Sequence, residues 1–190
     1  MTTYEVRTSG EFYSLIGTGL KYEDSHREEI AHRVFYGETL TPIWSELKCT
    51  QLDQSLPLGN FMRIDILGSL MVVLPSTLNI EAIAGFLSEA GELLPITIDG
   101  SPAHIVHTFR RIDAVNLSQS DSYPLSTHVT SNRPTFYESR LPNNGGLFRV
   151  TEAWNRVFIA EPDEGGFKAA YEDFSLTGLT FVERSVTGDD

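Results

Sequence analysis

Few of the features that would place this chain in a specialised class occur in its sequence. Among 190 residues there is one cysteine, Cys49, so no disulfide can form within the chain, which suits a reducing compartment. The longest apolar run, Leu70 to Leu74, has the length of a strand and falls far short of the ~20 residues that cross a membrane. The first residues contain neither a basic segment nor an apolar stretch, so no secretory signal is readable. We therefore expect a soluble, cytoplasmic protein that does not bind membranes.

Basic residues are scarce. The chain has 14 Lys and Arg against 26 Asp and Glu, which gives a net charge of −12. Such a chain repels a phosphate backbone, so we expect no nucleic-acid partner. A basic protein would be attracted, although the same charge also serves solubility alone. Half of the net charge lies in residues 161–190, which contain eight acidic and two basic residues.

Signatures of common enzymes are also absent. Gly17-Thr18-Gly19 lacks the remainder of a dinucleotide-binding fingerprint, and its flanks do not read as a strand that opens a helix. No Gly-Lys-Ser or Gly-Lys-Thr sequence occurs, and no serine lies in a Gly-x-Ser-x-Gly elbow. We therefore predict no cofactor and no catalytic residue.

The histidines and the cysteine do not form a metal site by spacing. His26 and His32 are six residues apart and would lie on different faces of a helix. His104 and His107 are three apart in an expected strand, so their side chains would point to opposite faces. A lone cysteine such as Cys49, near Trp44 and Leu47, is more typical of a buried small side chain than of a nucleophile.

The first half of the chain predicts mixed secondary structure. Tyr4 to Arg7 reads as a short strand, and apolar residues at helical spacing predict a helix over Arg27 to Tyr36. Leu40 to Pro57 reads as a loop with one helical turn. Asn60 to Leu67 alternates as a half-buried strand, and Leu70 to Leu74 reads as a fully buried one.

A helix follows from Pro75-Ser76 to Gly91, with one apolar stripe formed by Ile80, Ile83, Ala84 and Leu87. Turn signals then separate six short β segments, at Leu94–Ile98, His104–Phe109, Ile112–Leu117, Arg133–Tyr137, Gly146–Val150 and Trp154–Ala160. Gly166 to Asp173 reads as another helix, and Leu176 to Val182 as a last strand.

Strands outnumber helices and follow one another in series. This order favours an α+β fold, mainly antiparallel sheet with two or three helices, over repeated βαβ units. We expect a single domain with its main body at residues 60–190. Residues 1–59 form an N-terminal α+β layer, and the sequence leaves open whether this layer belongs to the same domain.

Acidic residues flank the predicted helix of residues Gly166 to Asp173 at both ends. Asp163 and Glu164 precede it, and Glu172 and Asp173 end it, where carboxylates oppose the helix dipole. This arrangement is typical of a solvated face and is also what a surface for a basic partner needs. Aromatic side chains often dominate interfaces. As partner-binding residues we select Asp163, Glu164, Glu172, Asp173, Trp154 and Tyr171, with Phe174 as a further anchor.

Short hydrophobic motifs between residues 60 and 182 resemble one known family. They are Leu94-Pro95-Ile96-Thr97-Ile98, Ile105-Val106-His107-Thr108-Phe109, Ile112-Asp113-Ala114-Val115-Asn116, Leu147-Phe148-Arg149-Val150, Phe158-Ile159-Ala160 and Thr177-Gly178-Leu179-Thr180-Phe181. In this pattern the chain resembles the immunity protein 11-like family of bacterial polymorphic toxin systems, formerly a domain of unknown function. Asn116 stands where that family is expected to have an aspartate.

The resemblance implies a protein that binds a cognate toxin domain and neutralises it by stoichiometric inhibition. The family has no established catalytic residues, so the resemblance assigns no catalytic, cofactor-binding or metal-binding residue to this chain. Two other functions stay open: a small hydrolase that uses His107 or His128 with Asp113 or Asp121, and a structural or scaffold protein of a phage or secretion apparatus. The sequence also leaves open whether copies of the chain associate as a homo-oligomer.

Overall fold

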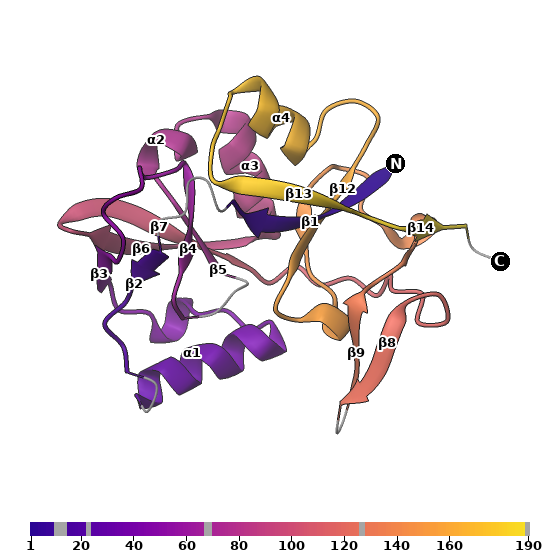
Figure 1. Cartoon of the computed structure of the whole chain (residues 1–190), viewed down its shortest axis with the longest axis horizontal. Helices are drawn as coiled ribbons and strands as arrows, with labels where there is room; N and C mark the ends of the chain where they lie inside the picture. Colours follow the sequence, from indigo (N-terminus) through magenta and orange to yellow (C-terminus); the bar gives the residue numbers. More distant parts are fainter. Residues whose placement is uncertain (10–14, 22–23, 67–69, 126–127, 189–190) are drawn as a thin grey trace.

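A computed structural model describes residues 1–9, 15–21, 24–66, 70–125 and 128–188 of the chain. These residues form an α+β domain built from a closed β-barrel and an antiparallel sheet, with helices on the outside (Figure 1). The expected fold class is confirmed. The barrel was not part of the expectation.

Six strands close the barrel in the order β2-β3-β6-β7-β5-β4. They are β2 (Leu15–Gly17), β3 (Leu47–Gln51), β4 (Phe61–Ile64), β5 (Leu70–Val73), β6 (Gly91–Ile98) and β7 (Ser101–Thr108). Four of the contacts are antiparallel, whereas β2–β4 and β3–β6 run parallel. Asp99 and Gly100 turn β6 into β7 with positive φ at both residues, as a tight hairpin turn of right-handed strands requires.

The antiparallel sheet joins the two ends of the chain. Its order is β11 (Leu147–Phe148), β12 (Val157–Glu161), β1 (Thr2–Thr8) and β13 (Leu179–Arg184), so β1 lies between strands from the C-terminal part. Because residues 1–59 supply β1 to this sheet and β2 and β3 to the barrel, they are part of the same domain. Two smaller pairs complete the strands: β8 (Asp121–Leu125) with β9 (His128–Arg133), and β10 (Phe136–Tyr137) with β14 (Val186–Thr187).

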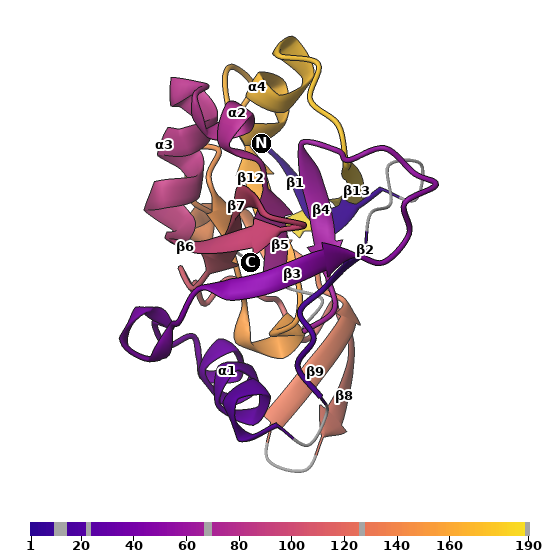
Figure 2. The same ribbon diagram turned by 90° about the vertical axis from the view of Figure 1, so that its left-hand side faces the viewer.

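The described residues include four α-helices, α1 (Ser25–Tyr36), α2 (Pro75–Leu78), α3 (Glu81–Ala90) and α4 (Phe167–Asp173). The Asp24 side chain caps α1 by accepting a hydrogen bond from the His26 amide, and Gly37 ends the helix with a φ of 69°. In both Figure 1 and Figure 2, α3 and α4 lie together at the top of the molecule and α1 lies at the bottom. There are also three 3₁₀ turns, η1 (Thr41–Ile43), η2 (Glu138–Arg140) and η3 (Thr151–Ala153).

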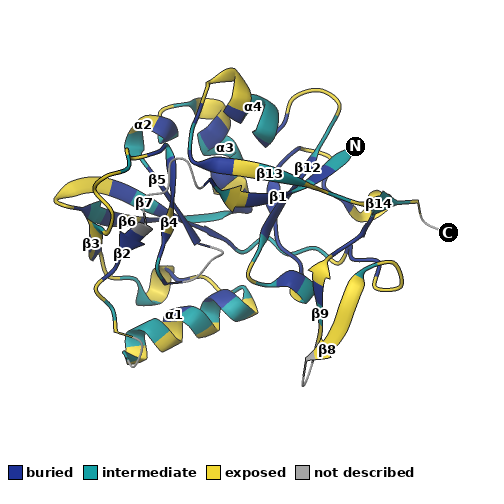
Figure 3. Ribbon diagram, viewed as in Figure 1, coloured by how far each residue is buried: buried dark blue, intermediate teal, exposed yellow. Residues whose placement is uncertain are grey.

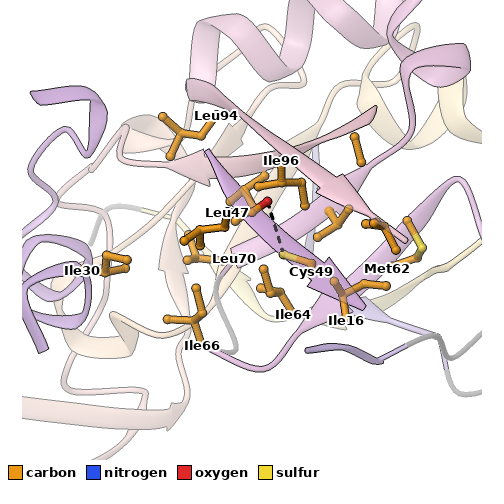
Figure 4. Packing of buried hydrophobic residues seen from close by; sticks show 14 of the residues in the cluster. Ile16, Ile30, Leu47, Cys49, Met62, Ile64, Ile66, Leu70, Leu94 and Ile96 are labelled. Atoms are coloured by element: carbon orange, nitrogen blue, oxygen red, sulfur yellow. Dashed lines mark hydrogen bonds between the residues drawn. The ribbon is translucent and has the colours of Figure 1, made fainter. Parts of the chain in front are cut away.

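Alternation along the strands produces separate cores. One cluster draws residues from all six barrel strands, including Ile16, Cys49, Met62, Leu70, Ile96 and Ile105, and α1 covers it with Ile30 and Val34 (Figure 4). The opposite faces of β4, β5 and β7 point to a second cluster shared with α3, α4 and the sheet, with Phe61, Val73, Val106, Leu87 and Phe167. A third cluster, including Phe136, Phe148 and Phe158, lies on the other face of the sheet. Figure 3 shows the buried strands between partly exposed helices.

Three local expectations were wrong. The segment Leu40 to Pro57, expected to be a loop, contains β3 together with the turn η1. The helix expected from Pro75 to Gly91 is two helices, separated at Asn79 and Ile80, whose short polar and β-branched side chains have low helix propensity. Ile112 to Leu117 is an irregular segment that makes a single bridge to Phe136.

The side chain of Asn116 organises the turn at the end of this last segment. Its Oδ1 accepts hydrogen bonds from the backbone amide and the hydroxyl of Ser118, at 3.1 and 2.6 Å. Its Nδ2 donates to Thr187 Oγ1 at 3.3 Å. The side chain therefore acts as both acceptor and donor, which an amide can do and an ionised carboxylate cannot.

Candidate functional site

Two of the selected acidic residues lie in the connection between β12 and α4. Asp163 and Glu164 are both exposed, and the Asp163 side chain retains 97% of its accessible surface. Its carboxylate lies 3.7 Å from the amino group of Met1, an ion pair that solvent screens strongly. Both carboxylates are therefore open to a partner.

The other two acidic residues lie at the end of α4. Glu172 and Asp173 are exposed, and Lys168 Nζ donates to Glu172 Oε1 at 2.6 Å one turn earlier in the helix. Phe174 follows directly and is 52% exposed, among the most exposed large apolar side chains of the described chain. We call Asp163, Glu164, Glu172, Asp173 and Phe174 the α4 surface. The neighbouring helix α3 adds the exposed Glu81 and Glu89 (Figure 1).

One acid of this region is committed to the fold. Glu161, at the end of β12, accepts hydrogen bonds from the backbone amides of Lys168 and Ala169 at 3.2 and 2.8 Å. A carboxylate on the first-turn amides of a helix stabilises that end. Glu161 therefore fixes the start of α4, and with it the position of the exposed acids on either side.

The two aromatic residues selected with these acids do not join them at the surface. Tyr171 is 8% exposed and packs in the second core cluster, where its hydroxyl accepts a hydrogen bond from the Leu179 amide at 3.0 Å. Trp154 packs on Phe35 of α1, with ring centroids 5.0 Å apart. Since α1 and α4 lie at opposite ends of the molecule in both views, Trp154 is remote from the α4 surface (Figures 1 and 2).

The carboxylate paired with His107 is that of Glu92. It is fully buried, and its Nδ1 lies 2.9 Å from Glu92 Oε1. Burial lowers the pKa of His107 despite this carboxylate, so the ring is neutral at pH 7. Asp113 is highly exposed and lies 3.7 Å from Arg140, whereas Asp121 lines a cavity with Arg133. The side chain of His128 is outside the described residues.

Cys49 belongs to the barrel core. It is 3% exposed, and burial together with the charge of Asp65 raises the pKa of its thiol to about 11. The thiolate that a nucleophile needs is therefore scarce at neutral pH. Within the described ranges, no group of three or more His, Cys, Asp or Glu side chains has a geometry that could hold a metal ion.

A group of arginines around Glu5 was not anticipated from the sequence. Glu5 is 4% exposed on β1, and its carboxylate accepts from Arg7 Nε at 2.7 Å, from Arg156 Nη1 at 3.3 Å and from Arg184. Glu5 and Arg7 are two residues apart in a strand, a spacing that places both on one face and could have signalled the pair. Arg156 comes from the turn before β12 and Arg184 from β13, and only the sheet order brings these strands to β1.

Comparison with known proteins gives no assignment: no family model matches the chain, and no curated protein is significantly similar to it. No helix among the described residues is long and apolar enough to cross a membrane.

Proposed function

We propose that the chain is an immunity protein, which binds a cognate bacterial toxin domain one to one and blocks it. The observation that carries the proposal is the α4 surface, where exposed carboxylates lie before and at the end of α4 and the exposed ring of Phe174 follows the helix. The resemblance of residues 60–182 to the immunity protein 11-like family supplies the class of partner. The absence of catalytic motifs from the sequence is compatible with inhibition by binding alone.

The electrostatics of the surface suit a basic partner. Asp163, Glu164 and Asp173 are exposed to solvent, and Glu172 shares its charge with Lys168. Acidic residues at an interface raise the association rate and orient the encounter. A nuclease toxin, whose active site must attract phosphates, would present the complementary charge. In many interfaces a few buried aromatic side chains supply most of the binding energy. The exposed ring of Phe174 could supply such an apolar contact here.

The first experiment is co-expression of the full chain with the C-terminal domain of a large secreted protein encoded beside it. Rescue of growth together with a stable one-to-one complex is the expected result. Toxicity of every such neighbouring domain without rescue or binding would overturn the immunity function. The scaffold and hydrolase alternatives would then have to be tested, by the oligomeric state and by substrate screening.

The second experiment locates the contact. A double variant, Asp163→Lys with Glu164→Lys, should slow association with the toxin by about tenfold or more and weaken its dependence on salt. The matched control is Glu46→Lys with Asp113→Lys, which makes the same change in net charge at exposed positions outside the α4 surface. Equal association rates for the two double variants would remove the α4 surface from the interface.

A further inference from the structure

Strand β13 forms one edge of the antiparallel sheet, because among the described strands only β1 pairs with it. The pairing runs without interruption from Leu179 to Arg184, and the strand contains no proline. Proteins usually protect such an edge with prolines, bulges or a covering segment, since its free N–H and C=O groups can pair with another strand. The backbone groups that point outward from β13 therefore show whether this edge is protected.

The alternation of an antiparallel ladder identifies these outward groups. The Ser9 amide donates to the carbonyl oxygen of Gly178 at 2.8 Å, so these two residues form a hydrogen-bonded pair. Since such pairs alternate along two antiparallel strands, every second residue after Gly178 also directs its N–H and C=O groups to β1. The residues between them direct these groups away from β1: Leu179, Phe181 and Glu183.

Other parts of the protein close this edge at both of its ends. The Tyr171 hydroxyl occupies both outward groups of Leu179, at 3.0 Å from the amide nitrogen and 3.3 Å from the carbonyl oxygen. Beyond the other end of β13, the carbonyl oxygen of Ser185 accepts from the Phe136 amide at 3.0 Å, where β10 and β14 pair. A further strand could therefore reach β13 only between these two points.

The stretch between them is open. No described residue forms a hydrogen bond with the outward N–H and C=O groups of Phe181 and Glu183. We call Phe181 to Glu183 the open edge. A cavity of about 260 Å³ lies beside Glu183 and Ser185, and its wall also includes Asp121. The protein thus leaves space next to the strand that another chain can enter.

The side chains of the open edge indicate what can pair with it. Phe181 packs against the second core cluster, and Glu183, two residues further on, lies on the same face of the sheet and is exposed. The cations nearby are paired with carboxylates: Lys168 with Glu172, and Arg184 with Glu5. Helix α4 lies directly above β13 in Figure 1, so the open edge continues the acidic α4 surface.

We propose that the open edge pairs with an extended segment of the toxin, which adds a strand to the sheet beside β13. This inference rests on the proposed immunity function and adds a backbone contact to the α4 surface. In strand addition, main-chain hydrogen bonds supply affinity and the alternate side chains supply specificity. The added strand carries a basic side chain beside Glu183 and an apolar one beside Phe181, since such pairs stabilise neighbouring strands.

Amide hydrogen exchange, followed by NMR on the full chain, tests the open edge without toxin. The amides of Phe181 and Glu183 should exchange quickly, whereas the Val182 amide, which points to β1, should exchange slowly. Slow exchange of all three would show that the edge is covered in the free chain and would overturn the inference. Protection of Phe181 and Glu183 that rises with protein concentration would assign the edge to a second copy of the chain instead.

The second measurement uses the toxin domain that co-expression identifies. In the complex the amides of Phe181 and Glu183 should become protected from exchange. Glu183→Pro should weaken binding by about tenfold or more, because proline removes the outward N–H while the groups that pair with β1 stay in place. Glu183→Gln is the matched control, which loses the charge but keeps the N–H, and should weaken binding less. Thermal unfolding of both variants without toxin checks that they fold.

The outcomes separate this inference from the immunity function. A one-to-one complex in which both amides still exchange quickly would overturn the strand addition and leave the immunity function intact. Equally tight binding of Glu183→Pro and Glu183→Gln would do the same. If no toxin domain binds the chain, the immunity function and the strand addition fail together.

Discussion

Nδ1 of His107 lies 2.9 Å from Oε1 of Glu92, and this contact joins β7 to β6 across their hairpin. The same carboxylate accepts from the hydroxyls of Thr39 and Thr41, at 2.5 and 2.6 Å, and from the backbone amides of Leu40 and Thr41. Glu92 therefore accepts hydrogen bonds from the N–H and O–H groups of residues 39–41, at the start of the turn η1. Through it the barrel wall and the connection from α1 to β3 hold each other in place.

Replacement of Glu92 by Gln should destabilise the domain by about 2–3 kcal/mol. The amide would present two N–H groups to donors that need an acceptor, and the His107 ring would lose its charged partner. The measurement is the free energy of unfolding in urea. Glu46→Gln, at an exposed site, is the control and should change it by less than about 0.5 kcal/mol. Equal effects of the two replacements would contradict the role of Glu92.

The stability of the protein should fall as the pH is lowered below about 6.5. Burial lowers the pKa of His107, so between its folded value and 6.5 the unfolded chain binds a proton that the folded chain does not. The pKa of Glu92 is lowered to about 2, because hydrogen bonds from His107, Thr39 and Thr41 outweigh its burial. Its contribution is complete above pH 4.5 and is lost between 4.5 and about 2.

Urea unfolding at a series of pH values separates the two groups. His107→Gln should make the free energy of unfolding nearly independent of pH just below pH 6.5. The loss of stability below pH 4.5 should remain, because it comes from Glu92 and from Glu5, whose pKa is also lowered. If the wild-type chain and His107→Gln had the same slope just below pH 6.5, the assignment of that step to His107 would be wrong.

Local patterns predicted many elements of this fold because those elements are fixed by nearby residues. Helix α1 has an apolar stripe, a capping Asp24 and a terminal Gly37, all within its own segment. Closure of the barrel was not predictable in this way. It depends on the parallel contacts of β2 with β4 and of β3 with β6, which join residues about fifty positions apart. Strand β3 also alternates, but its short pattern lies among turn-forming residues.

In the candidate sites, too, features fixed by nearby residues were predictable and features that depend on distant parts of the chain were not. The exposure of Asp163 and Glu164 follows from a charged turn, so sequence reasoning could place them at the surface. The sequence could not show whether Tyr171 lies in the core or at the surface, since an aromatic residue on a helix suits a core and an interface equally. The arginines around Glu5 come from β1, β13 and the turn before β12, and only the sheet order shows that they meet.

Gly178 should tolerate no side chain. Its φ is 101°, and a Cβ atom there would lie 1.8 Å from the carbonyl oxygen of Phe61, a backbone atom that cannot move aside cheaply. Gly178→Ala should therefore cost more than about 3 kcal/mol of unfolding free energy. Gly100→Ala is the control, because Gly100 also has positive φ, 83°, but open space around it, and should cost about 1 kcal/mol. Equal losses would show that the contact with Phe61 is unimportant.

Removal of the Tyr171 hydroxyl tests whether this residue serves the core. The hydroxyl accepts from the Leu179 amide at 3.0 Å and donates to the Leu179 carbonyl oxygen at 3.3 Å, which joins α4 to β13. Tyr171→Phe should destabilise the chain by about 1–2 kcal/mol, because it leaves these backbone groups without that partner. If the proposed toxin is the partner, Tyr171→Phe should leave its association rate unchanged, unlike Phe174→Ala. A slower association with unchanged stability would place Tyr171 in the interface instead.

Cys49 should be inert towards thiol reagents as long as the barrel is folded. Its side chain lies among Ile64, Met62 and Ile96 inside the barrel (Figure 4), and the pKa of its thiol is raised to about 11. At pH 8 the folded chain would hold about 100-fold less thiolate than an unperturbed cysteine, and the reagent also cannot reach the sulfur. Native protein should label with iodoacetamide over hours, whereas protein in concentrated guanidinium should label within minutes. Fast labelling of the native chain would show that the barrel opens readily or that Cys49 has a chemical role.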